Sequence, residues 1–168
     1  MNKIAAAAAA AAFALGIGFT SQSVEAMPNP IVEYQTYTDA ANNAGFKPLV
    51  LPQISGWSCN YISVISGKVA DLGFKSSYDN DAVLRVRTAR ADSPYGKDIS
   101  GVYGVKWQNQ VINGTTVSIA SINGGAAGWV AHWQHGSYVF SAQAAGLNQQ
   151  QFMQVLTYGL VDITAHYY

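Results

Sequence analysis

The chain has 168 residues, with nine basic and nine acidic side chains and no formal net charge at pH 7. This length suits one domain with a single hydrophobic core. Because Lys and Arg are few and form no run, the sequence lacks the phosphate neutralisation that nucleic-acid binding needs, and electrostatic attachment to anionic lipid is equally unsupported.

Residues 1–26 have the pattern of a signal peptide. Lys3 gives a basic start, Ile4 to Phe19 is uncharged and rich in alanine, and Val24-Glu25-Ala26 has the small or apolar residues that a signal peptidase reads. The apolar run is shorter than the roughly 20 residues of a spanning helix. We therefore expect cleavage near Ala26 rather than an uncleaved anchor, and a mature protein that is periplasmic or secreted.

After this segment, residues 27–35 are expected to form a leader arm, because prolines follow one another closely. Thr36 and Asp39 resemble a capping box, and Gly45 is a suitable left-handed C-cap, so a helix is predicted over 36–44. Phe46 to Leu51 is apolar but contains Pro48, which allows only a short or edge strand.

The middle of the chain has the two-residue period of strands, with turn signals at Ser66-Gly67, Asn113-Gly114 and His135-Gly136. Along the predicted strand 82–90, Arg85 and Arg87 occupy one face and apolar residues the other. We expect both arginines to be solvated, with contact to a small anion or a partner as the alternative. The predicted strands are 57–65, 68–76, 82–90, 105–112, 115–121, 129–134 and 137–143.

A two-residue turn at His135-Gly136 would pair Trp133 with Tyr138 and Ala131 with Phe140. These residues and Trp129 would then share one face of the sheet. Aromatic residues on one face are usually core beneath a helix, but they can also line a sugar or lipid site. The aromatic candidates for a ligand or partner surface are Trp107, Trp129, Trp133, Tyr138 and Phe140.

The last helix is predicted over 149–160, since Asn148 and Gln151 resemble a capping box and Phe152, Leu156 and Leu160 follow helical spacing. The expected fold is α+β. It has a curved antiparallel sheet of about seven strands joined by hairpins, with an N-terminal and a C-terminal helix packed on one face. Residues 36–168 would form this single domain.

Chemical motifs are weak. His132 and His135 lie three apart, so a continuous strand would point them to opposite faces, and no metal site is expected. Cys59 is expected to be a buried small apolar residue, with a reactive or intermolecular thiol as the alternative. No serine has the surroundings of a nucleophile elbow. We therefore expect neither an enzyme nor a cofactor; a polar cluster joining His132 or His135 to Asp98 would favour an enzyme.

Four features in order resemble a bacterial extracytoplasmic domain family of unknown function. They are Asp98-Ile99-Ser100-Gly101-x-Tyr103, Val111-Ile112-Asn113-Gly114, Trp133-x-x-Gly136-x-Tyr138 and the closing helix. The family is found C-terminal in anti-sigma-factor-like proteins and in sporulation or lipoprotein-sorting-like proteins. Two departures are His135, where relatives have an acidic residue, and the Gln-rich start of the closing helix. The resemblance implies no catalytic residues.

The expected function is that of an exported, non-enzymatic binding module that contacts another envelope protein or peptide. Exposed strand edges and the loop 91–104 would be its docking surfaces. The alternative is a carrier of a lipid or other apolar ligand, with the aromatic face as the cavity wall. A well-packed core beneath the closing helix would count against the carrier.

Overall fold

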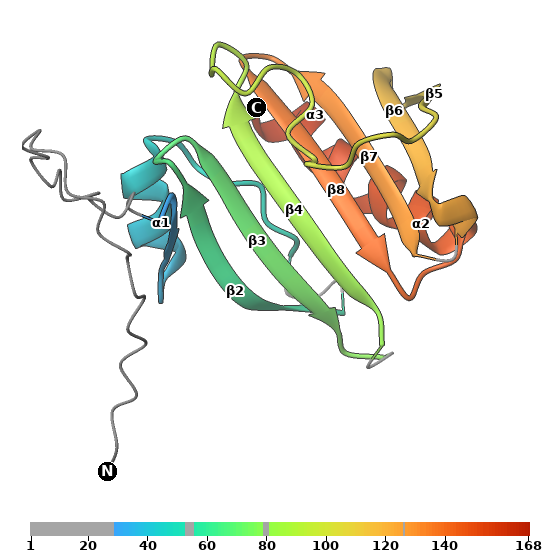
Figure 1. The fold of residues 1–168 in the computed structure, drawn as a ribbon, viewed down its shortest axis with the longest axis horizontal. Coiled ribbons are helices and arrows are strands. Elements are labelled where there is room, and N and C mark those ends of the chain that lie inside the picture. Colours follow the sequence, from blue (N-terminus) through green and yellow to red (C-terminus); the bar gives the residue numbers. More distant parts are fainter. Residues whose placement is uncertain (1–28, 53–55, 79–80, 126) are drawn as a thin grey trace, which may run out of the picture.

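An open antiparallel sheet of eight strands, in the order β1-β2-β3-β4-β8-β7-β6-β5, organises the protein (Figure 1). The computed structural model describes residues 29–52, 56–78, 81–125 and 127–168. The expected signal peptide, residues 1–26, lies outside the described residues. The strands are β1 (Ile31–Glu33), β2 (Trp57–Ile65), β3 (Val69–Ser76), β4 (Val83–Arg90), β5 (Gln108–Ile112), β6 (Thr115–Ile122), β7 (Gly128–His135) and β8 (Tyr138–Ala145).

The α+β class and the antiparallel sheet are confirmed, and the described residues form eight strands where about seven were expected. The additional strand, β1, lies within the segment 27–35 that was expected to be a leader arm. It pairs with β2 through Val32 and Val64 and forms one edge of the sheet. The predicted strand around Pro48 is wrong: residues 46–52 are irregular. The N–H of Leu49 donates to Thr88 Oγ1 at 2.9 Å, so it serves no strand ladder.

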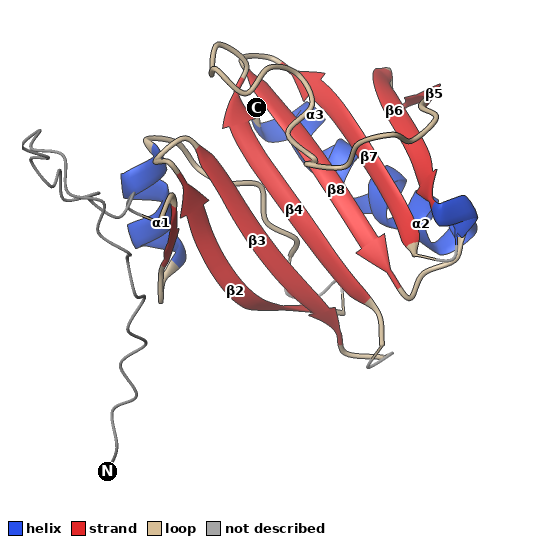
Figure 2. Ribbon diagram, in the orientation of Figure 1, coloured by secondary structure: helices blue, strands red, loops and turns tan. Residues whose placement is uncertain are grey.

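The sheet consists of two meanders, β1–β4 and β5–β8, joined by the loop 91–107. The loop starts at β4 in the middle of the sheet and ends at β5 on the far edge, crossing in front of β8 and β7 (Figure 2). Three hairpins then bring β8 back beside β4, where Val86 pairs with Ala142. The loop is long because it has to cross half of the sheet.

Two of the predicted hairpin turns differ in outcome. Asn113-Gly114 is a two-residue turn with φ of 49° and 79°, as the Asn-Gly signal predicts. The pairing expected at His135-Gly136 is wrong by two residues, because Trp133 lies opposite Phe140 and the turn is formed by residues 136–137. A shift of two residues leaves every side chain on its predicted face.

Helix α1 (Tyr37–Ala44) begins and ends as predicted. Thr36 Oγ1 accepts the N–H of Asp39 at 3.1 Å, and Gly45 closes the helix with φ of 76°. The C-terminal helix begins with the predicted capping box of Asn148 and Gln151. It consists of α2 (Gln149–Val155), a π-helical turn η3 (Leu156–Leu160) and α3 (Val161–Tyr167). It therefore extends beyond residue 160, where the predicted helix ends.

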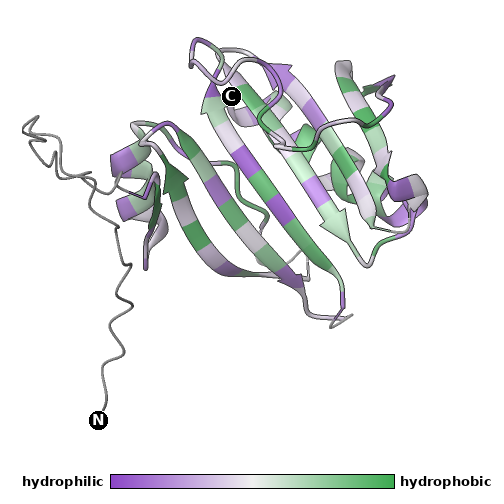
Figure 3. Ribbon diagram, viewed as in Figure 1, coloured by the Kyte–Doolittle hydropathy of each residue, from purple (hydrophilic) through white to green (hydrophobic). Residues whose placement is uncertain are grey.

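In Figure 2 helices α2 and α3 lie behind the sheet and α1 lies beside it at the β1 end, and side chains from all three pack in the main core. Polar and apolar residues alternate along β4 (Figure 3), which places one set against the helices and the other on the helix-free face. The largest core side chains include Phe74, Phe140 and Phe152. No helix among the described residues is both long enough and apolar enough to cross a membrane.

Candidate functional site

A row of polar residues crosses the helix-free face from strand to strand. Its centre is Asp71 on β3, which lies opposite Arg87 on β4, and Arg87 in turn lies opposite Ser141 on β8. The sheet register extends the row in both directions. In strand order from β1 to β5 its members are Glu33, Ser63, Asp71, Arg87, Ser141, His132, Ser118 and Asn109.

Asp71 is the hub of this row, since only 1% of it is exposed and it accepts bonds from three side chains. Arg85 Nε donates to Oδ1 at 2.7 Å and to Oδ2 at 3.0 Å, and Arg85 Nη2 also pairs with Oδ2. Arg87 Nε lies 3.2 Å from Oδ2, and the Tyr61 hydroxyl donates to Oδ1 at 3.2 Å. A buried carboxylate needs such partners to offset its lost hydration.

Arg87 connects this cluster to the loop 91–107. Its Nη1 donates to the carbonyl oxygens of Ile99 and Ser100, both at 2.9 Å. Ile99 is itself buried in a small second core with Val69 and Val139 on the helix-free face. The loop is therefore held down over one half of this face, and the lower part of β2, β3 and β4 is left uncovered by it (Figure 1).

Tyr61 is held flat against the sheet by the absence of a side chain at Gly73. A Cβ atom built on Gly73 would lie 1.9 Å from Tyr61 Cε1. Gly73 and Tyr61 face each other across β2 and β3, next to a register shift between Cys59 and Tyr61. The glycine thus lets the phenol ring cover the backbone and reach Asp71.

Beside this cluster lies a hollow of about 340 Å³ on the uncovered part of the sheet. Arg85 forms one wall, with 40% of its side chain exposed. Val83 and Ala145 are register partners that add apolar surface, and Asn60 and Gln143 add amide groups. The volume is at the lower end of the range for small-ligand sites.

The expectation that both arginines are solvated is wrong for Arg87, which is 13% exposed, and incomplete for Arg85. Sequence reasoning missed their partner Asp71. The signal was present: Asp71 is the one acidic residue inside the predicted strand 68–76, and that strand is followed along the chain by the strand that carries both arginines. A meander of these strands places acid and bases on one face.

Most of the aromatic candidates belong to the core. Trp133 and Phe140 are 2% and 0% exposed and stack with ring centroids 5.6 Å apart. Trp133 Nε1 donates to Thr164 Oγ1 of α3 at 3.1 Å. Trp129 and Tyr138 are half-buried against the same cluster. These four side chains therefore form no common ligand site, because Trp133 and Phe140 are buried in the core and the other two lie at its margin.

Trp107 lies apart from the other aromatic candidates, on the helix-free face. Its ring meets the His132 ring edge-on, with centroids 4.6 Å apart. Burial lowers the pKa of His132, and the charge of Asp98 opposes that effect. In the part of the chain that the structure describes, His132 and Asp98 share no hydrogen bond; Asp98 instead accepts the N–H of Ser100. The described residues also contain no cluster of His, Cys, Asp and Glu that could hold a metal ion.

Cys59 is exposed on β2, so the expectation that it is buried is wrong. Its Sγ donates to the carbonyl oxygen of Tyr61 at 3.4 Å. Partial desolvation raises the pKa of this thiol. The raised pKa disfavours the thiolate, which is the reactive form.

We expect the Asp71 cluster to weaken in alkaline solution. Burial, followed by the charge of Asp71, raises the pKa of Tyr61 from 10.0 to about 12. The folded state favours the neutral phenol of Tyr61. The contribution of this phenol to the stability of the fold is therefore complete below pH 10 and is lost as the pH rises from about 10 to about 12. Urea unfolding of the wild type and Tyr61→Phe between about pH 9 and 11 measures this effect.

The Tyr61→Phe variant has no phenol to ionise at this position and serves as the control for the other tyrosines. The wild type is expected to lose stability relative to this variant as the pH rises. Parallel pH curves for the two proteins would show that the pKa of Tyr61 is the same in the folded and unfolded states.

Comparison of the chain with family models, curated proteins and solved structures finds no match. The resemblance suggested by the sequence motifs therefore stays a prediction.

Proposed function

We propose that this protein is an exported, non-enzymatic binding module that contacts another envelope protein or peptide through the hollow beside Arg85. The observation that carries this proposal is the hollow itself, whose polar wall is fixed before any ligand arrives. Asp71 holds Arg85 through two nitrogen atoms and holds Tyr61 through its hydroxyl. A preformed site loses less side-chain entropy on binding than a flexible one.

The export signal supports the extracytoplasmic part of this proposal. The pattern of residues 1–26 is that of a cleaved signal peptide, and the chain that follows is neutral. A peptide or protein from the same compartment is then the natural partner class. The β1 edge offers additional contact surface, since Val32 on this strand is 49% exposed.

A random peptide library on beads tests the binding proposal with purified residues 27–168. Val83→Trp fills the hollow from a position that is 39% exposed, so the fold should tolerate it. Val111→Trp is the matched control on β5, the edge strand away from the hollow. Peptides selected on the wild type are expected to bind Val83→Trp at least tenfold more weakly, and Val111→Trp within about twofold, by fluorescence polarisation.

Two results would contradict the proposal. The library could yield no peptide that binds the wild type, or the selected peptides could bind Val83→Trp as tightly as they bind Val111→Trp. Circular dichroism of both variants shows whether either substitution has disturbed the fold.

The carrier of an apolar ligand remains a second candidate because of a groove on the helix side. This groove has a volume of about 540 Å³ and lies between α1, α3 and the segment 46–52. Its lining includes Tyr37, Tyr138 and Tyr168. The aromatic sheet face that the sequence suggested as a cavity wall does not support the carrier, because Trp133 and Phe140 are buried in the core beneath the helices. An apolar ligand would therefore lie at the surface of the core and not inside it.

A further inference from the structure

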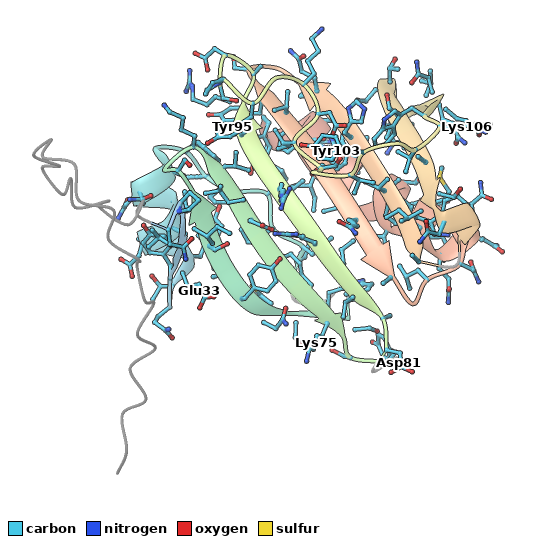
Figure 4. All side chains as sticks on the ribbon, in the orientation of Figure 1. Glu33, Lys75, Asp81, Tyr95, Tyr103 and Lys106 are labelled. Carbon is cyan, nitrogen blue, oxygen red and sulfur yellow. The ribbon has the colours of Figure 1, made fainter. Side chains whose placement is uncertain are left out.

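The Asp71 cluster carries an excess of positive charge beside the hollow. Two guanidinium groups, those of Arg85 and Arg87, meet one carboxylate. The other residues that line the hollow are uncharged. Lys75 and Asp81 lie farther down, at the end of β3 and in the turn that follows it (Figure 4). These two have opposite signs, and Glu33 on β1 lies on the same face as Asp71, opposite Ser63. Arg85 is therefore the charged side chain that faces the hollow.

Arg85 also has hydrogen-bonding capacity directed away from Asp71. Its Nε and Nη2 atoms form one edge of the planar guanidinium, and that edge pairs with the carboxylate. The Nη1 corner of the same plane therefore points away from Asp71. Arg85 lines the hollow with 40% of its side chain exposed, so the guanidinium can be reached from the hollow. A guanidinium held on one side and open on the other is suited to a second carboxylate.

The other side chains that line the hollow complement the end of a peptide chain. Asn60 and Gln143 each offer an amide N–H donor and a carbonyl acceptor, which is the complement of a peptide group. Val83 and Ala145 provide an apolar surface for one side chain. Asn60, Tyr61 and Val83 are exposed at the rim, so a longer chain can leave the hollow across the sheet.

We propose that the hollow binds the C-terminal carboxylate of a peptide, with Arg85 as its anchor. This inference rests on the proposed binding function and names the chemical group that the site takes. The carboxylate would pair with the Nη1 corner of Arg85, the last side chain would cover Val83 and Ala145, and the last peptide group would meet Asn60 or Gln143. Charge complementarity favours this occupant over an amine or a neutral chain end.

The test uses the same bead library in two forms, one with free-acid C-termini and one with C-terminal carboxamides. The wild-type chain is expected to bind selected free-acid peptides about tenfold or more tightly than their amides, because the amide lacks the charge that strengthens the bond to Arg85. Equal binding of the two forms would overturn the carboxylate assignment. It would leave the binding function intact, whereas a library without binders of either form would overturn the function itself.

Two variants assign the preference to Arg85. Arg85→Gln removes the charge and is expected to bind acid and amide peptides equally, while Arg85→Lys keeps the charge without the planar fork and should retain part of the preference. Val83→Trp leaves Arg85 and Asp71 in place and should weaken binding of the free acid, so the proposal can be tested even if Arg85→Gln fails to fold. An acid preference that persists in folded Arg85→Gln would overturn the role of Arg85.

Benzoate distinguishes a peptide end from a free organic acid. It carries a carboxylate on an apolar ring and has no peptide group. Benzoate is expected to displace the selected peptides only at concentrations at least tenfold above those of unlabelled peptide. Displacement at equal concentration would show that the peptide group contributes nothing, and would contradict a peptide as the occupant.

Discussion

Asp71→Ala is expected to lower the free energy of unfolding by about 3–5 kcal/mol, because it leaves two guanidinium groups without their shared carboxylate. Asp71 is 1% exposed and Arg87 is 13% exposed, so water replaces little of the lost interaction. The loss should also release the loop 91–107, since Arg87 holds the carbonyl groups of residues 99 and 100. Urea unfolding at pH 7 measures the change.

Asp92→Ala is the matched control for this prediction. Asp92 also pairs with an arginine, Arg90, at 3.4 Å, but its side chain is 77% exposed. Its removal should change stability by less than about 0.5 kcal/mol, as for surface ion pairs generally. Asp71→Asn keeps the shape of the side chain and tests the charge if the alanine variant does not fold. Equal effects of Asp71→Ala and Asp92→Ala would show that the buried cluster contributes no special stability.

The second large effect is expected for Phe140→Ala, at about 3–5 kcal/mol. Phe140 is 0% exposed and contacts the rings of Trp133 and Tyr168, with centroid distances of 5.6 Å and 5.0 Å. Its removal leaves a cavity that the surrounding strands and helices cannot fill without moving. Thermal or urea unfolding provides the measurement.

Val111→Ala is the corresponding surface control, and it should cost less than about 0.5 kcal/mol because Val111 is 73% exposed. A cost below about 1 kcal/mol for Phe140→Ala would mean that the site beneath α2 and α3 is loosely filled. Such a result would favour the carrier of an apolar ligand over the binding module.

The sequence predicts the local structure of this protein well, because local signals control it. The caps at Thr36 and Asn148 lie within four residues of the groups that they bond, and the Asn113-Gly114 turn determines its own geometry. The alternation along β4 likewise separates Arg85 from the core. Each of these features depends on neighbours in the chain, which a single sequence displays directly.

The features that the sequence does not predict depend on distant pairings. The order of the strands places β8 beside β4, and no local pattern shows this. The irregular path of residues 46–52 follows from the bond between Leu49 and Thr88, which lies 39 residues farther along the chain. The hollow beside Arg85 combines residues of β2, β3, β4 and β8, so its composition follows only from the assembled sheet.

The pairing of β4 with β8 also has a consequence for how the chain folds. Strands β2–β4 and β5–β8 can each form from neighbouring hairpins, but the two sets become one sheet only when β4 pairs with β8, where Arg90 lies opposite Tyr138. All of residues 91–137 must be closed into a loop before this pairing yields any contact. Contacts of such long sequence separation slow folding. The joining of the two meanders is therefore the step that we expect to limit the folding rate, and until it occurs each meander exposes an unpaired strand edge.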